Sequence, residues 1–478
     1  MTIGSDIAAI VGPEYMTDEP ETLERYSRDS SFVTPRRPGY VAFPKDVEEV
    51  QGIVKYANEN RISVTPRSSR IGFYGAGIPY QSGIIVDLSR MNKILEIDGP
   101  DKRVKIEPGV TWAQLQEELE KNGLMVCSPL LPHPLNSALT SSMERDPILI
   151  PKSEYNDTLL TTQLVLPSGD LFFTGTAMGS GMKSQVFPES IIPGNTKLFQ
   201  GAQGTLGIIT WANIKAEWIP AMDKLFFIPF EKVEELAEPI YSIQRRMLGS
   251  ECFALNGFNL ATILAEKWPD DFEKLRASLP PYVLLFCASG FHIFPEGKIE
   301  YEEEALMEIA SELGFEAIST VADIPGLGEK LLKMLRKPWQ RDEYWKFRYK
   351  SACHNIFFYT TLNRVPEFSQ AIYDVADRHG YPAEDIGFYL QPVERGRACF
   401  CQYSFPASPD DEREVSQVRN LYLEASEKAI SMGGVFTRPY GPWADMVYSR
   451  AGNYTFLMKT VKNAFDPHDI MNPGKLCF

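Results

Sequence analysis

The sequence predicts an α+β protein with two domains. Short strand-like runs alternate with amphipathic helices, and many of the strands are joined by short turns that favour antiparallel pairing. The composition changes after Pro220, where a domain boundary is expected. A length of 478 residues is enough for two large domains, each with its own hydrophobic core.

In the first part of the chain, apolar side chains at helical spacing predict two helices, the second ending near Gly123. Alternating apolar residues, closed by turn-forming residues, predict strands and hairpins around them. The helices are expected at residues 44–60 and 111–124, and the strands at residues 61–66, 84–89, 91–109, 161–175 and between the glycine-rich turn 201–207 and Pro220.

Beyond Pro220 the same two patterns alternate, which predicts a second α+β unit built around one sheet. Residues 224–247 are expected to form a strand followed by a helix. Further strands are expected at residues 282–291, 355–362 and 398–406, and further helices at residues 298–313 and 365–380.

The charge balance excludes one class of partner. The chain has 48 lysine and arginine residues against 63 aspartate and glutamate residues, a net charge of −15. A protein that binds nucleic acid through the phosphate backbone needs an excess of cations, so no nucleic-acid partner is expected. The N-terminal residues lack the basic and apolar regions of a secretory signal, and no run approaches the ~20 apolar residues of a membrane span. We therefore expect a cytoplasmic protein without a membrane span.

The seven cysteines are scattered at irregular intervals, unlike a disulfide framework. Cys399 and Cys401 are close enough to act together, but they supply only two ligands, so no metal site is expected.

The glycines at Gly72, Gly75 and Gly77 do not form a dinucleotide fingerprint. That motif needs a helix that begins inside the glycines, whereas here Pro79 and a strand follow. Two readings stay open for this loop: a long turn, or a nest whose backbone N–H groups approach a diphosphate.

Several motifs gain weight from their order along the chain. The loop PRSSRIGFYGAG is followed by KIEPGVTWAQLQEEL, the small-residue segment PLNSALTSSMERD, LVLPSGDL and GAQGTLGIIT, and VKNAFDPHDIMNPGKLCF closes the chain. This order resembles the FAD-binding half of the vanillyl-alcohol oxidase and p-cresol methylhydroxylase superfamily, which also contains glycolate oxidase and D-lactate dehydrogenase flavoproteins. The segment GGVFTRPYGPWADMVYSRAGNYTFLMKTVKNAFDP is most similar to the vanillyl-alcohol oxidase branch.

The resemblance implies a PCMH-type FAD-binding domain at residues 1–222, a substrate or cap domain at 223–432 and a C-terminal segment at 433–478 that returns to the FAD domain. FAD would lie between the domains. The residues expected to bind it are Pro66, Arg67, Ser68, Ser69, Arg70, Ile71, Gly72, Gly77, Pro129, Ser137, Ser141, Ser142, Gly204, Thr205, Gly207, Ile209 and Lys475.

Flavin-dependent oxidation of a carbon needs a fixed cation near the flavin, because negative charge develops on the ring during hydride transfer. The resemblance places Arg438 in that role. A hydroxyl substrate also needs a proton acceptor. The candidates for it are Tyr440, His354, Glu394 and Tyr389.

The departures from the family pattern also carry predictions. Members that tether FAD use a histidine or tyrosine in the cap or a histidine in the first loop, but residues 393–400 contain neither and Ile71 stands in the loop. Noncovalent FAD is therefore expected, with Tyr389 and Tyr403 flanking the gap. Phenol-oxidising members hold a phenolate with a tyrosine, and this chain has Thr437 at the matching position. The chain also lacks a histidine-bearing metal motif like that of the glycolate and D-lactate branch.

Two arginines could bind a substrate carboxylate, Arg395 and Arg397, although a charged strand edge explains them equally well. The expected function is an FAD-dependent dehydrogenase that oxidises a small alcohol, an aromatic alcohol or phenol, or a hydroxy acid, and passes electrons to a protein. Two alternatives stay open: an electron-relay subunit of a larger redox complex, and a flavin-using synthase without net oxidation. Homo- and hetero-oligomers are both compatible with the sequence.

Overall fold

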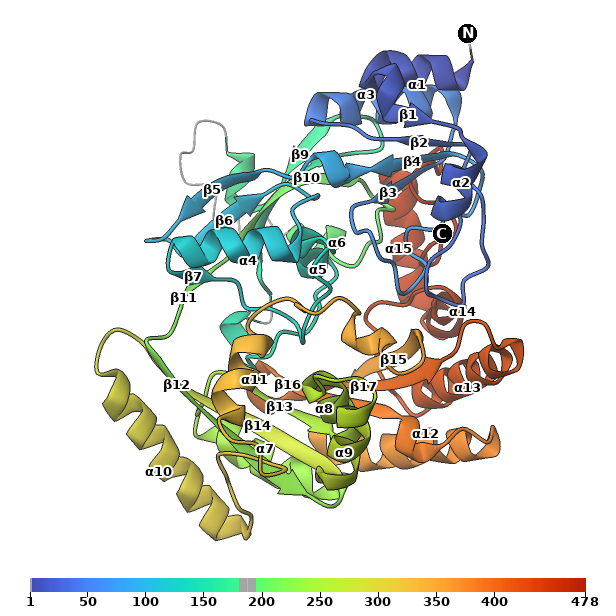
Figure 1. Ribbon diagram of the computed structural model, residues 1–478. Helices are drawn as coiled ribbons and strands as arrows, with labels where there is room; N and C mark the ends of the chain where they lie inside the picture. The colour runs from blue at the N-terminus through green and yellow to red at the C-terminus, as the bar shows by residue number, and fades with distance from the viewer. Residues whose placement is uncertain (1, 156, 180–186, 188–194) are drawn as a thin grey trace.

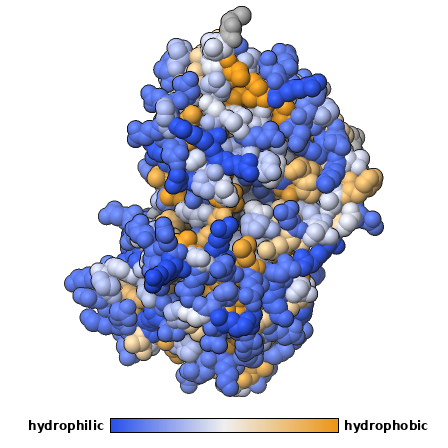
Figure 2. Space-filling view, turned by 90° about the vertical axis from the view of Figure 1, so that its right-hand side faces the viewer, coloured by the Kyte–Doolittle hydropathy of each residue, from blue (hydrophilic) through white to orange (hydrophobic). Residues whose placement is uncertain are grey.

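The computed structural model describes residues 2–155, 157–179, 187 and 195–478. The chain forms two lobes (Figure 1): one contains the N-terminal sheets together with the C-terminal helices, and the other contains the sheet of the middle of the chain. The surface narrows between the lobes, where hydrophobic side chains gather beside hydrophilic ones (Figure 2).

The first lobe contains three small sheets and the helices that cover them. Its strands are β1 (Met16–Thr17), β2 (Tyr40–Ala42), β3 (Val64–Arg67), β4 (Ile84–Asp87), β5 (Ile94–Asp98), β6 (Arg103–Ile106), β7 (Leu124–Met125), β8 (Leu159–Val165), β9 (Leu171–Phe173), β10 (Ile208–Lys215) and β11 (Glu217–Trp218). Its helices are α1 (Ile3–Val11), α2 (Pro20–Tyr26), α3 (Val47–Asn60), α4 (Trp112–Lys121), α5 (Ala138–Met143), α6 (Thr196–Phe199) and α15 (Gly452–Phe465). The short helix α14 (Pro442–Tyr448) joins the lobes, and its Trp443 is buried in the core of the second one.

The sheets of this lobe differ in strand direction. One has the order β1-β2-β4-β3, in which β4 runs parallel to both β2 and β3. The second is antiparallel with the order β5-β6-β10-β8-β9, and β7 pairs with β11. Helix α3 begins where the Asp46 side chain accepts a hydrogen bond from the Glu49 N–H, and its buried apolar face covers the first sheet.

The second lobe is built on one antiparallel sheet of six strands with the order β12-β14-β13-β16-β17-β15. Its strands are β12 (Met222–Phe230), β13 (Cys252–Asn256), β14 (Tyr282–Gly290), β15 (Ala352–Thr360), β16 (Gly387–Val393) and β17 (Ala398–Ala407). Its helices are α7 (Ala237–Arg245), α8 (Gly257–Leu264), α9 (Asp270–Ser278), α10 (Pro295–Leu313), α11 (Leu327–Leu335), α12 (Val365–Arg378) and α13 (Glu412–Ser431).

Side-chain alternation along β17 separates two environments. Phe400 and Gln402 line a cavity between the lobes, whereas the Tyr403 hydroxyl lies 2.7 Å from the Ser369 hydroxyl of α12. Cys399 and Cys401 share the face of Tyr403, and their sulfur atoms are 4.0 Å apart. The strand thus presents one face to the cavity and the other to the helices.

Residues near the C-terminus are hydrogen-bonded to strand β3. The Val64 N–H donates to the Ile470 carbonyl at 2.7 Å, and the Asn472 N–H donates to the Val64 carbonyl at 2.8 Å. The buried ammonium of Lys462 in α15 donates to Asp466 Oδ2 at 2.6 Å and to the carbonyls of Thr205 and Met471 at 3.0 and 2.8 Å. These contacts fix the C-terminal segment beside the first sheet.

The predicted fold class is confirmed, and the predicted helices and strands occur with small shifts at their ends. The structure adds elements that the sequence analysis did not identify, among them β13, β16, α8, α9, α11 and α13. The boundaries near residues 222 and 432 stay a proposal. No helix in the described part of the chain combines the length and apolar character that a membrane crossing requires.

Candidate active site

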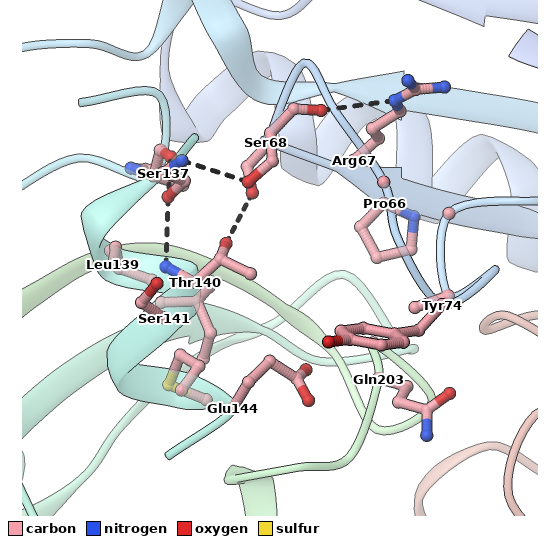
Figure 3. A pocket seen from close by; sticks show the side chains of 18 of the residues that line it. Pro66, Arg67, Ser68, Tyr74, Ser137, Leu139, Thr140, Ser141, Glu144 and Gln203 are labelled. Carbon is pink, nitrogen blue, oxygen red and sulfur yellow. Dashed lines mark hydrogen bonds between the residues drawn. The ribbon is translucent and has the colours of Figure 1, made fainter. Parts of the chain in front are cut away.

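A cavity of about 250 Å³ opens in the first lobe, beside the residues that follow β3. Its walls come from the loop after β3, the start of α5, the loop that precedes β10, and Arg438 with Tyr440 from the C-terminal segment. Figure 3 shows side chains from the first three of these segments converging on one space. We call it the cofactor cavity.

Two glycines bring backbone segments together around the cofactor cavity. Gly204 has φ +72°, and a Cβ there would lie 2.3 Å from Cγ of Pro66. A Cβ on Gly72 would lie 2.5 Å from an Asp29 oxygen. Any larger residue at either position would force the loops apart, so both glycines serve close packing.

The loop after β3 has unused hydrogen-bond donors. The backbone N–H groups of Ser69, Arg70 and Gly72 donate to no described residue, whereas the Ile71 N–H donates to Asn136 Oδ1 at 3.2 Å. Free N–H groups that lie close together in a loop, as those of Ser69 and Arg70 do, allow a nest to bind a phosphate oxygen. Together with the glycine contacts, this loop fits the diphosphate of a dinucleotide.

Serine and threonine hydroxyls tie this loop to the start of α5. Ser68 Oγ lies 2.6 Å from Thr140 Oγ1, and the Ser137 N–H donates to Ser69 Oγ at 3.0 Å (Figure 3). Ser137 also caps α5, because its Oγ accepts from the Thr140 N–H. The predicted small-residue segment therefore positions the loop as well as lining the cavity.

Asp29, which lines the cavity, and Lys475, which does not, both hold the loop at Gly75. Asp29 Oδ2 accepts from the Gly75 N–H at 2.8 Å, and Lys475 Nζ donates to the Gly75 carbonyl at 2.8 Å. Burial lowers the pKa of Lys475 to about 8. Lys475 thus supports the loop from behind and does not line the cavity.

The opposite end of the cofactor cavity is charged. Arg438 pairs with Asp146, its guanidinium carbon lies 4.4 Å from the ring centre of Phe357, and its Nε has no hydrogen-bond partner among the described residues. Tyr440 donates its hydroxyl proton to Glu144 and stacks on Tyr74 with ring centres 5.0 Å apart. An unpaired buried donor costs free energy unless a ligand accepts from it.

The electrostatics of these groups follow from burial. Burial alone would lower the pKa of Arg438, but Asp146 raises it well above its usual value, so the guanidinium stays charged. Burial raises the pKa of Glu144, although the Tyr440 hydrogen bond opposes this, and burial also raises the pKa of Tyr440 well above its ordinary value. Tyr440 is therefore a proton donor at neutral pH.

A second cavity of about 120 Å³ adjoins the first, and we call it the substrate cavity. The two share the lining residues Phe73, Tyr74, Asn136, Ser141, Asp146 and Arg438. The remaining walls come from both lobes. Their aromatic residues are Trp112, Tyr344, Trp345, Tyr389 and Phe400, and their polar residues include His133, Lys346 and Gln402.

The structure brings many of the predicted site residues together. The predicted residues that line the cofactor cavity are Pro66, Arg67, Ser68, Ser69, Ile71, Gly72, Gly77, Ser137, Ser141, Gly204, Gly207, Ile209, Arg438 and Tyr440. Pro129 lines the substrate cavity instead. Arg70, Ser142, Thr205 and Lys475 line neither cavity, although Thr205 and Lys475 hold the surrounding backbone in place.

The other candidates, except Tyr389, lie outside both cavities. His354 stacks on Phe32 with ring centres 3.7 Å apart, and Glu394 lies in a turn after β16 beside Arg397. Tyr403 faces α12, whereas Tyr389 lines the substrate cavity and donates its hydroxyl proton to Gln391. Arg395 and Arg397 line neither cavity.

Residues that the sequence analysis did not single out complete the site: Asp29, Tyr74, Glu144, Asp146 and Gln203. The sequence offered a signal for Glu144 and Asp146, because both belong to the small-residue segment PLNSALTSSMERD. In the described part of the chain, no cluster of three or more histidine, cysteine, aspartate or glutamate side chains is placed to hold a metal ion.

Comparisons with known proteins agree with this geometry. The family "FAD binding domain" matches residues 38–137, and the family "FAD linked oxidases, C-terminal domain" matches residues 303–476. Glycolate oxidase subunit GlcD of Bacillus subtilis is 24% identical over 99% of this chain and 96% of its own length. D-2-hydroxyglutarate dehydrogenase of Stutzerimonas stutzeri is 25% identical over 98% of each chain. The crystal structure of p-cresol methylhydroxylase superposes with a TM-score of 0.85 at 19% identity, covering 99% of this chain and 96% of that one.

Proposed function

Because the chain belongs to the FAD-linked oxidoreductases of the vanillyl-alcohol oxidase and p-cresol methylhydroxylase superfamily, we propose that it is a dehydrogenase of a small organic substrate. The substrate is a small alcohol, an aromatic alcohol or phenol, or a hydroxy acid, and the electrons pass to a protein acceptor. Residues 1–222 with 433–478 form the proposed FAD unit, and residues 223–432 form the proposed cap.

One observation carries this proposal: the substrate cavity shares a wall with the cofactor cavity and is lined by both lobes. A subunit that only relays electrons would need an open flavin face without convergent polar groups. Here aromatic side chains surround a small space in which Asp146, Lys346 and Arg438 also lie. Such a pocket is typical of small-molecule binding.

Different residues of the cofactor cavity would contact different parts of FAD. The free N–H groups of the loop after β3 would bind the diphosphate, and Gly204 allows the loop before β10 to pack closely against Pro66 at the wall of the cofactor cavity. Arg438 would place a fixed positive charge at the far end. When bound, FAD supplies the hydride acceptor that the protein itself lacks.

Proton transfer is assigned to Asp146. Its carboxylate lines both cavities and is held by Arg438, so it lies within reach of a substrate hydroxyl without needing to move. Tyr440 and Glu144 form a separate hydrogen-bonded pair at the cofactor cavity, and Tyr440 retains its proton at neutral pH. Arg438 therefore positions the base and also supplies charge to the flavin site.

The experiment is anaerobic mixing of the purified holoprotein with small alcohols, phenols and hydroxy acids, with flavin absorbance near 450 nm as the signal. Bleaching by one class supports a dehydrogenase and names its substrate. Consumption of substrate without bleaching or acceptor would favour the synthase. Acid precipitation of the same sample tests the linkage, and noncovalent FAD is expected in the supernatant.

A further inference from the structure

We propose that Lys346 selects a substrate that carries a carboxylate remote from the carbon that is oxidised. This inference rests on the proposed function, because it names the class of substrate for the same cavity. It follows from where Lys346 lies, from the charges that surround it, and from the donors beside it.

Lys346 belongs to the part of the substrate cavity that is separate from the flavin site. It lies in the short 3₁₀ turn Trp345–Phe347 of the second lobe and lines the substrate cavity, but not the cofactor cavity. Asp146 and Arg438 line both. A substrate that reacts beside Asp146 and Arg438 would therefore extend its other end toward Lys346.

The charges in the substrate cavity do not cancel. Asp146 and Arg438 neutralise each other as an ion pair. Lys346 makes no ion pair or hydrogen bond with any described residue, which leaves one positive charge without a counterion. Desolvation lowers the pKa of Lys346, because burying the charged ammonium costs free energy. A bound anion would offset this cost.

His133 adds a neutral donor to the same part of the cavity. Its Nδ1 accepts from the Leu135 N–H at 3.2 Å, so the proton of the neutral ring is on Nε2. Burial lowers the pKa of His133, which keeps the ring neutral near pH 7. Lys346 and His133 together offer an ammonium and an N–H, which suits the two oxygens of a carboxylate.

The walls restrict the rest of the substrate. Tyr344, Trp345, Tyr389 and Phe400 surround a volume of about 120 Å³, which favours a small body with flat apolar faces. A substrate of this class is an aromatic alcohol with a carboxylate at the far side of the ring. In a 2-hydroxy monocarboxylic acid, by contrast, the only carboxylate is attached to the reacting carbon and would not extend to Lys346.

The test uses two pairs of probes with the FAD-loaded enzyme. The first pair, 4-(hydroxymethyl)benzoate and 4-methylbenzyl alcohol, differs in the remote carboxylate. The second pair, benzoate and benzyl alcohol, is measured by the perturbation of the flavin spectrum on binding. The variants are Lys346→Met, which keeps the length of the side chain, and Lys346→Arg, which keeps the charge. Lys459→Met, an exposed lysine on α15, is the matched control.

The wild-type enzyme is expected to bind each carboxylate about 10- to 100-fold more tightly than its neutral partner, as for a hydrogen bond between charged groups. Lys346→Met should abolish this difference and leave the neutral probes unchanged, whereas Lys346→Arg should retain most of it. Equal loss for both members of a pair, or no preference in the wild type, overturns the inference.

The two proposals fail in different ways. If benzoate binds through Lys346 but no probe reduces the flavin, the dehydrogenase function is wrong and the anion site stands. If 4-(hydroxymethyl)benzoate reduces the flavin with equal efficiency in wild type and Lys346→Met, the function stands and the role of Lys346 is wrong.

Discussion

Replacing Lys462 with methionine should destabilise the FAD lobe without touching either cavity. Lys462 is 3% exposed and Asp466 is 1% exposed, so the variant leaves a buried carboxylate without its cation. Loss of one member of a buried pair costs about 3–5 kcal/mol. The lower end applies here, because Asp466 still accepts from the N–H groups of Ile470 and Met471 at 3.1 and 2.8 Å.

We therefore expect the free energy of unfolding of this lobe to fall by about 3 kcal/mol. Urea denaturation, followed by flavin fluorescence as FAD is released, measures the change. Lys459→Met, on the exposed side of the same helix, should shift the value by less than about 0.5 kcal/mol.

The double variant Lys462→Met with Asp466→Asn separates charge from packing. It removes the stranded carboxylate, so it should be more stable than Lys462→Met alone. If Lys462→Met changes stability no more than Lys459→Met does, or if the two substitutions simply add, the assignment of a buried ion pair as the anchor of the C-terminal segment is refuted.

Three further outcomes are expected. Arg438→Met should retain FAD but slow flavin reduction about 100- to 1000-fold in stopped-flow absorbance, whereas exposed Arg450→Met should not. Gly204→Ala should weaken FAD binding in a fluorescence titration, because its Cβ would lie 2.3 Å from Pro66; Gly123→Ala, with φ +69° and no atom within 4 Å, should leave binding unchanged. Burial lowers the pKa of His354 to about 4, whereas the same ring in the unfolded chain titrates at about 6.5. Between about pH 6.5 and pH 4 the unfolded chain therefore binds the proton more readily, and the free energy of unfolding falls as the pH is lowered. His354→Phe should flatten this part of the plot of urea midpoint against pH.

Local patterns were enough to predict the α3 and α4 helices, the hairpin of β5 and β6, and the strands β12, β14, β15 and β17, because their apolar spacing is regular. Strand β13 and helix α8 were not predicted. Every residue of both is buried, so neither shows the alternation of polar and apolar faces that marks a surface element.

The loops around the cofactor cavity were expected from the order of their motifs and from the family resemblance, and their glycines and small residues allow backbones to approach closely. The partners of Arg438 could not be predicted in the same way. Asp146 lies 292 residues away in the sequence, and its pairing with Arg438 depends on how the C-terminal segment returns to the first lobe. Tyr403 flanks the segment in which related proteins tether FAD, and the sequence alone could not show that its hydroxyl faces α12.

The pairing of β3 with the final residues also bears on how the protein is made. Thr65 contacts Asn472, which leaves the ribosome 407 residues later, and at about 5–20 residues per second this takes roughly 20 to 80 seconds. During that interval the sheet of residues 222–407 can close, since all its strands are contiguous in the chain. During the same interval the edge of β3 in the nascent first lobe is unpaired, so it is accessible to chaperones and to other chains. Cofactor loading is consequently among the last events of biosynthesis.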